Sequence, residues 1–138
     1  MEIRSSFGRN INITKELRKR YDKLQKGFLF KERDAKNIFM VSMVLGYINK
    51  SREKIVNPSP LLNITSFSDG DLWLMVAISV EGKKGLSVLN NISEIKKIAS
   101  EYANAGLIYL EELSADYGTG EGLELAILKK AKENLKKN

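Results

Sequence analysis

The stretch "NISEIKKIASEYANAGLIYLEEL", residues 91–113, carries a long helical repeat. Its apolar side chains recur three and four positions apart, so they fall on one side of an α-helix. Asn91 and Glu94 have the spacing of a capping box, which marks a helix start, and Ser68 and Asp71 have the same spacing. The sequence therefore predicts a helix beginning at each pair. The buried side of the later helix is predicted to consist of Ile95, Ile98, Ala99, Tyr102, Gly106, Tyr109 and Leu113.

Besides the helix at residues 91–113, four segments favour helix, and one of them is the helix that begins at Ser68. Residues 14–28 and 123–137 carry narrow apolar stripes on otherwise charged surfaces, which is typical of helices on the outside of a protein. Residues 31–49, after a polar first turn, and residues 71–80 are apolar on all sides, as helices buried inside a bundle must be. We expect Trp73 to anchor the second of these buried helices.

The connections complete the predicted fold. Pro58 and Pro60 forbid a regular helix, so residues 50–67 are predicted to form a long loop. Residues 1–12 read as a flexible, basic N-terminal arm. The prediction is a single all-α domain, a compact bundle of four or five helices.

The composition argues against an enzyme. The 138 residues include no histidine and no cysteine. The chain therefore lacks the side chain that most often serves as general base, and it lacks thiolate nucleophiles and cysteine metal ligands. The acidic residues Glu111, Glu112 and Asp116 could hold Mg²⁺ or supply paired carboxylates, and the favoured interpretation is a solvated helix face. We expect no catalytic activity, no cofactor and no bound metal.

The glycines of "DYGTGEG", residues 116–122, do not resemble a phosphate-binding loop. Such a loop follows a buried strand and opens a helix whose amides hold the phosphates. Here the acidic end of a predicted helix precedes the glycines, and Glu121 would place a negative charge where the phosphate should lie. The segment is interpreted as a turn between two helices.

The longest apolar run, residues 38–48, is about half as long as the ~20 residues that a membrane-spanning helix needs. The first residues do not have the pattern of a signal peptide. We therefore expect a cytoplasmic protein with no membrane partner, in the host cytoplasm if its source is viral.

The net charge of +6 is unevenly distributed. Residues 1–60 are strongly basic and residues 61–117 are acidic, so either a polyanion docks on the first half or two copies meet basic to acidic. Alternatively, the charges on these helices only keep the protein in solution and serve no partner. If nucleic acid is bound, the predicted contacts are Arg4, Arg9, Lys15, Arg18, Lys19, Arg20, Lys23 and Lys26.

Two segments favour contact with a partner helix. "YANAGLIYL", residues 102–110, combines small residues that allow a close approach with tyrosines that add contact area. The stripe at residues 123–137 is narrow enough for one partner helix. A homodimer is plausible on this pattern, and packing within the chain is the alternative. The candidate interface residues are Tyr102, Ala105, Gly106, Tyr109, Leu123, Ile127, Ala131 and Leu135.

Three stretches together resemble a known family: "NIFMVSMVLGYINKSR", "SDGDLWLMVAIS" and the segment at residues 91–113. They are similar to the small accessory proteins associated with DNA phosphorothioation (dnd) gene clusters of bacteria, archaea and their mobile elements. The resemblance covers about residues 30–115. It implies an accessory, non-catalytic role near a DNA-modification or defence system, or in a virus or plasmid, and it carries over no catalytic residues.

Two hypotheses follow for the function. The first is a non-enzymatic helical module that binds another protein, as a homodimer, within a DNA-associated assembly. The second is direct binding of nucleic acid, without sequence specificity, by the basic N-terminal segment and first helix. The salt dependence of DNA binding distinguishes them, since phosphate contacts weaken steeply as salt rises.

Overall fold

The computed structural model describes residues 3–25, 35–83, 85–117, 128–129 and 132–133. Parts of the predicted helices at 14–28 and 31–49, the glycine-rich turn and most of the predicted helix at 123–137 lie outside these residues.

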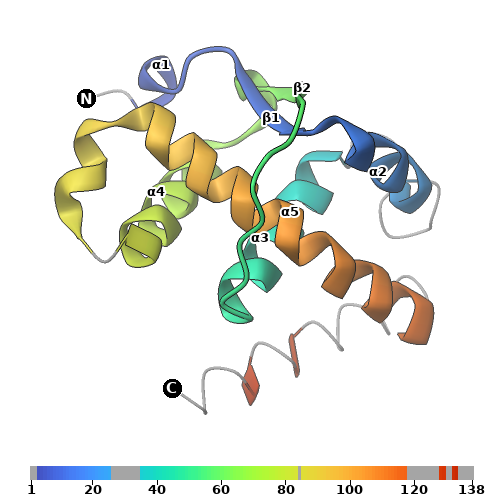
Figure 1. Cartoon of the computed structure of the whole chain (residues 1–138). Helices are drawn as coiled ribbons and strands as arrows, with labels where there is room; N and C mark the ends of the chain where they lie inside the picture. Colours follow the sequence, from blue (N-terminus) through green and yellow to red (C-terminus); the bar gives the residue numbers. More distant parts are fainter. Residues whose placement is uncertain (1–2, 26–34, 84, 118–127, 130–131, 134–138) are drawn as a thin grey trace.

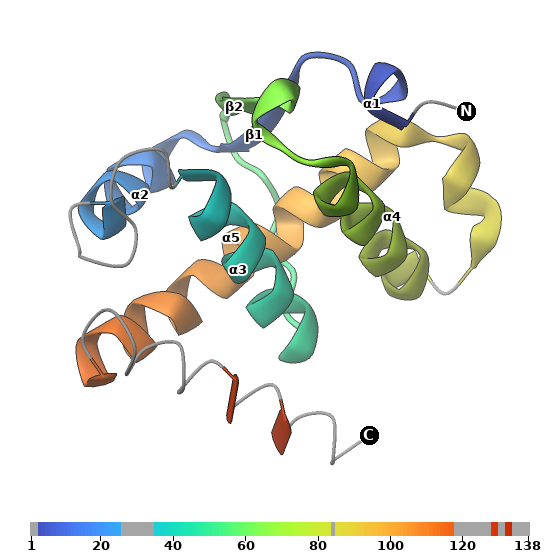
Figure 2. The same ribbon diagram turned by 180° about the vertical axis from the view of Figure 1, so that it is seen from behind.

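Three long helices form the body of the molecule (Figure 1). α5 (Ile92–Tyr117) runs through its middle, and α3 (Ala35–Ile48) and α4 (Asp69–Lys83) pack against α5. Figure 2, seen from behind, shows α3 and α4 in front of α5. On the opposite side, residues 51–57, which we call the crossing segment, pass over α5 (Figure 1). The predominantly helical fold is confirmed.

A small sheet adds to the helices, so the prediction of a strictly all-α fold is wrong. β1 (Asn10–Thr14) pairs antiparallel with β2 (Pro58–Asn63), with Asn10 opposite Asn63 and Thr14 opposite Pro58. The loop predicted at residues 50–67 therefore contains a strand. The remaining short elements are α1 (Ile3–Ser6), η1 (Lys15–Leu17), α2 (Arg18–Gln25), η2 (Ile64–Ser66) and η3 (Leu86–Asn90).

The sequence of the two strands explains the pairing. Ile11 and Ile13 are buried on either side of the exposed Asn12, which is the period of two that a strand requires. Proline is tolerated in β2 because each strand of a two-stranded sheet has one edge without a partner, where no backbone N–H is needed. Pro58 and Pro60 thus exclude a helix but not a strand.

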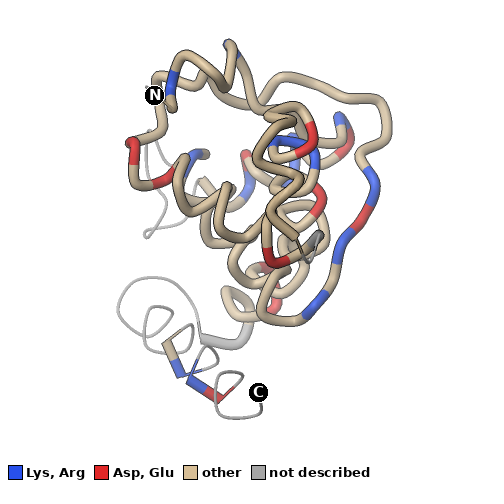
Figure 3. The backbone as a smooth tube through the Cα atoms, turned by 90° about the vertical axis from the view of Figure 1, so that its left-hand side faces the viewer, with Lys and Arg blue, Asp and Glu red and all other residues tan. Residues whose placement is uncertain are grey.

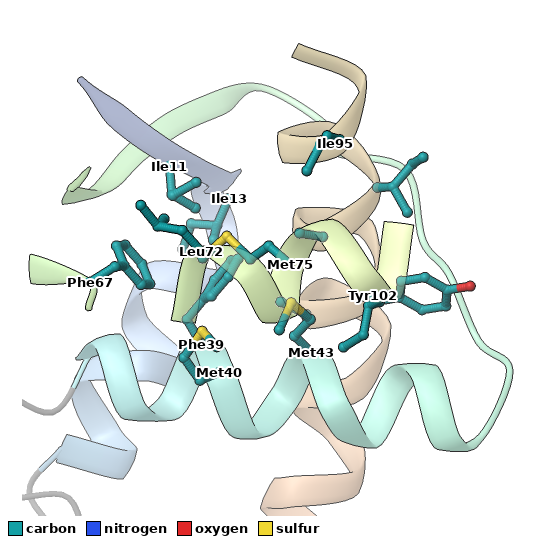
Figure 4. Close-up of a cluster of buried hydrophobic side chains, with 14 of the residues drawn as sticks. Ile11, Ile13, Phe39, Met40, Met43, Phe67, Leu72, Met75, Ile95 and Tyr102 are labelled. Carbon is teal, nitrogen blue, oxygen red and sulfur yellow. The ribbon is translucent and has the colours of Figure 1, made fainter. Parts of the chain in front are cut away.

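The N-terminal residues are packed into the protein, in contrast to the flexible arm that the sequence predicted. Ile3, Phe7 and Ile11 are buried, and Phe7 is only 1% exposed. They belong to the main hydrophobic core, which Figure 4 shows where β1, α3, α4 and α5 meet. In that core the rings of Phe39 and Phe67 meet edge to face, with centroids 5.9 Å apart.

The contact between α3 and α5 depends on two glycines. A Cβ atom added at Gly106 would lie 1.7 Å from the carbonyl oxygen of Ser42, and one added at Gly46 would lie 2.1 Å from that of Tyr102. Both distances are far below any real contact, so the two backbones touch directly. Only glycine fits on each side of this crossing.

The helix ends follow local hydrogen-bonding rules. The Ser68 N–H donates to Asp71 Oδ2 at 2.9 Å and the Asp71 N–H donates to Ser68 Oγ at 3.1 Å, which confirms the predicted capping box of α4. The Glu94 N–H donates to Asn91 Oδ1 at 3.1 Å at the start of α5. The capping predictions therefore place both helix starts correctly.

The C-terminal end of α3 has the hydrogen bonds of a Schellman motif. The Lys50 N–H donates to the Tyr47 carbonyl at 3.0 Å, and the Ser51 N–H donates to the Gly46 carbonyl at 2.9 Å. Lys50 adopts a φ of 55°, in the left-handed region that glycine usually occupies. This turn sends the chain from α3 into the crossing segment.

Candidate functional site

Two of the basic residues predicted to contact nucleic acid hold the sheet and its surroundings together. Arg4 donates to the Ile64 carbonyl at 3.0 Å and forms an ion pair with Asp69 at 2.9 Å. Arg18 donates to the Pro60 carbonyl on β2. Both guanidinium groups therefore have structural partners within the chain.

A third basic candidate, Arg20, joins α2 to α5. Its guanidinium makes a two-pronged contact with the carboxylate of Glu111, including an Nε–Oε2 hydrogen bond of 2.9 Å. Hydrogen bonding to Glu111 raises the pKa of Arg20 above its ordinary value, although burial opposes the shift. Glu111 therefore forms an ion pair with Arg20, whereas the neighbouring Glu112 is exposed to solvent.

The other basic candidates are exposed. Arg9, Lys15, Lys19 and Lys23 point to solvent, and Lys26 lies outside the described residues. Lys15 and Lys19 line an open recess of about 690 Å³ together with Glu16, Asn57 and Pro58. These two lysines are the part of the predicted set that the structure brings together at a hollow in the surface.

A second recess, of about 430 Å³, lies between the crossing segment and the first half of α5. Three of its lining residues are basic, Lys54, Lys96 and Lys97, and none of these was among the residues predicted from the sequence. Pro58 lines both recesses, so they adjoin each other. Figure 3 shows basic positions along the crossing segment and on the neighbouring helices.

The acidic residue in this second recess is neutralised. Glu101 is buried, and its Oε1 accepts hydrogen bonds from Arg52 Nε at 3.1 Å and from Arg52 Nη2 at 2.6 Å. The Glu53 N–H donates to the carbonyl of Glu101 at 3.1 Å. These contacts fix the crossing segment on α5 and pair the carboxylate of Glu101 with Arg52 and not with a lysine of the recess.

Most of the residues predicted to face a partner protein pack within the chain. Tyr102, Ala105 and Gly106 are buried, and the neighbour that approaches Gly106 closely is α3 of the same chain. Tyr109 is half-buried, with its hydroxyl 3.2 Å from Ser51 Oγ. These four residues therefore pack within the chain, which was the alternative to an interface with a partner. Leu123, Ile127, Ala131 and Leu135 lie outside the described residues.

A different apolar surface is exposed on α4, the helix that lies in front of α5 in Figure 2. Trp73 is 52% exposed and Leu74 is 40% exposed, so the prediction that Trp73 anchors the core is wrong. Gly70 and Ala77 are also exposed, and the spacing of these four residues places them on one side of the helix. We call this surface, Gly70, Trp73, Leu74 and Ala77, the Trp73 face.

The Trp73 face could not be predicted from the sequence, because α4 is apolar on every side. Its buried side is formed by Leu72, Met75 and Val76, which pack into the core. A helix packed against one neighbouring layer buries only one side, and a uniformly apolar sequence does not show which side that is. The exposed residues become recognisable only when the position of α5 is known.

No protein-family model, no curated protein and no solved structure matches this chain. Among the residues that the structure describes, no helix has the length and apolar character to span a membrane. Within the same residues, acidic side chains do not gather in groups of three or more that would suit a metal ion.

Proposed function

We propose that this protein is a non-catalytic interaction module that forms a homodimer through the Trp73 face. The observation that carries the proposal is the exposure of Trp73, 52%, beside the exposed Leu74 on the same side of α4. Tryptophan is enriched among the residues that dominate binding energy at protein interfaces. Where exposed apolar residues form a large contiguous patch, the patch marks a site where another protein binds.

The shape of the Trp73 face favours a second copy as the partner. Gly70 and Ala77 lie one turn away from Trp73 on either side, so the large indole is flanked by two small residues. When two copies of α4 pack antiparallel about a two-fold axis, Trp73 of each copy lies over small residues of the other. A two-fold interface requires this self-complementarity.

The resemblance to accessory proteins of DNA phosphorothioation clusters supports a role for such a dimer in a DNA-associated assembly. Its task there would be to hold components together, since the Trp73 face offers apolar contact area and no reactive group. The residues of the Trp73 face, which would make this contact, lie on α4. This helix falls within the part of the chain that resembles the family.

The test uses Trp73 as its own reporter, because it is the only tryptophan in the chain. We expect its fluorescence emission to shift to shorter wavelength as the protein concentration rises from nanomolar to high micromolar. Sedimentation velocity over the same range should show conversion of monomer to dimer. The Trp73→Ala variant should remain a monomer throughout.

Ile108→Ala is the matched control, because Ile108 is 50% exposed and belongs to α5, whereas the Trp73 face belongs to α4. This variant should dimerise as the parent does. A monomer at every concentration, with constant tryptophan emission, would overturn the homodimer proposal. Equal loss of dimer in both variants would place the interface elsewhere.

A further inference from the structure

We propose that the two adjoining recesses beside Pro58 form one groove that binds the phosphate backbone of a nucleic acid. Lys54, Lys96 and Lys97 line one recess, and Lys15 and Lys19 line the other. We call these five side chains the lysine groove. They come from η1, α2, α5 and the crossing segment, and the fold brings them to one side of the molecule.

The charge of the groove favours a polyanion. Five lysines face two carboxylates: Glu101 is paired with Arg52, whereas Glu16, whose Oε1 accepts a hydrogen bond from the neutral amide Asn57 Nδ2 at 3.3 Å, keeps its charge. The lysines therefore remain in excess. Five ammonium groups exceed what a single phosphate needs. They suit a chain of phosphates that passes from one recess to the other.

The lining also indicates which part of a nucleic acid would be recognised. Ser93, Ser100 and Asn12 add neutral hydrogen-bonding groups to the larger set of lysines. Among the described residues that line the two recesses, none is aromatic, so bases would have no ring to stack on. Contacts to phosphate oxygens position a protein on nucleic acid without reading its sequence.

Lys96 is held in place for such a contact. Its Nζ donates to the Phe7 carbonyl at 2.8 Å, which uses one of the three ammonium hydrogens and leaves two for a ligand. Burial lowers the pKa of Lys96 below its ordinary value of 10.5. A bound phosphate would act in the opposite direction, because a nearby negative charge favours the charged form of a lysine.

The experiment measures fluorescence anisotropy of a labelled mixed-sequence DNA duplex, titrated with the full chain at several salt concentrations. For about four phosphate contacts, we expect log K to fall with log salt with a slope of about −4. We expect Lys54→Gln/Lys97→Gln to weaken binding by about tenfold or more at moderate salt and to reduce the slope by about 2.

The matched control is Lys129→Gln/Lys132→Gln, which removes the same charge from two exposed lysines outside the groove. Its affinity should change by less than about threefold. The charge-retaining pair Lys54→Arg/Lys97→Arg should bind as the parent does, and thermal unfolding followed by circular dichroism checks that every variant is folded.

Equal weakening by the groove pair and the control pair would show general charge attraction and overturn the proposal. Absence of binding at 50 mM salt, or loss of binding in the arginine pair although it is folded, would also overturn it. The proposal is independent of the Trp73 face: a monomeric protein with the same selective loss would support the groove and contradict only the dimer.

Discussion

At the scale of single residues, Gly106 determines whether α5 can meet α3. Alanine at this position would place a Cβ atom 1.7 Å from the Ser42 carbonyl oxygen, which belongs to a helix backbone and has no rotamer to change. We therefore expect Gly106→Ala to lower the free energy of unfolding by at least about 3 kcal/mol. Urea unfolding followed by circular dichroism measures this change.

Gly70 provides the comparison for this prediction. A Cβ atom added there meets nothing nearer than Ser68 Oγ, at 3.7 Å, and Gly70 lies in the first turn of α4. Gly70→Ala should therefore raise the free energy of unfolding by up to about 1 kcal/mol, because alanine favours helix over glycine. Equal destabilisation by the two substitutions would mean that the close contact between α3 and α5 is not what holds Gly106.

The residue scale also shows what the sequence can and cannot predict. The small residues at Ala105 and Gly106 correctly indicated that a helix backbone approaches α5 closely. Whether that helix belongs to the same chain or to a partner is not encoded in those residues, because the packing requirement is the same for both. Trp73 was misplaced for a related reason, since an indole fits equally well in a core and in an interface.

At the scale of elements, the end of α3 contains a residue that is poorly suited to its backbone conformation. Lys50 occupies the left-handed position of a Schellman motif, with φ of 55°. We expect Lys50→Gly to raise the free energy of unfolding by up to about 1 kcal/mol, because glycine adopts this conformation without the steric cost of a Cβ atom. Lys50→Ala, which keeps the Cβ atom, should give no such gain when both are compared by urea unfolding.

The start of α4 makes stability depend on pH. Burial alone would raise the pKa of Asp71, but the Ser68 N–H and Lys36, whose Nζ lies 3.1 Å from Asp71 Oδ2, outweigh it and hold the pKa below its ordinary value of 3.8. Because the folded-state pKa is lowered, the stabilisation is complete above about pH 4 and is lost as the pH falls through the folded-state value.

Asp71→Asn tests this dependence. At pH 7 we expect the variant to be less stable than the parent by about 1 kcal/mol, the usual contribution of a capping interaction. The difference should shrink toward zero as the pH is lowered below 3.8. Urea unfolding at a series of pH values measures it, and a difference that stays constant down to pH 2 would contradict the assignment.

At the scale of the whole molecule, the N-terminal segment closes the core. Phe7 is 1% exposed and its carbonyl accepts a hydrogen bond from Lys96 of α5. We expect Phe7→Ala to lower the free energy of unfolding by about 3–5 kcal/mol, as for other buried aromatic residues. A flexible arm would instead make this substitution neutral, so chemical unfolding distinguishes the two descriptions directly.

At this scale, the helices can be predicted from the sequence, but the contacts between distant segments cannot. The three long helices and the starts of α4 and α5 follow from local patterns, which act over one or two turns. The sheet depends on residues 10–14 pairing with residues 58–63, and the lysine groove depends on two recesses, one lined by Lys15 and the other by Lys54 and Lys97, adjoining at Pro58. No local pattern encodes such distant pairings, so the recesses could not be predicted from the sequence, and neither could the part played by Lys54, Lys96 and Lys97.

The central position of α5 has a consequence for the newly made chain on the ribosome. α3, α4 and β1 all pack against α5, yet each of them is synthesised before it. Translation proceeds at about 5–20 residues per second, so the 26 residues of α5 take roughly 1–5 seconds to add. During that interval the apolar sides of α3 and α4 have no lasting cover. The nascent protein is therefore expected to be a substrate for chaperones that shield exposed apolar helices until translation supplies α5.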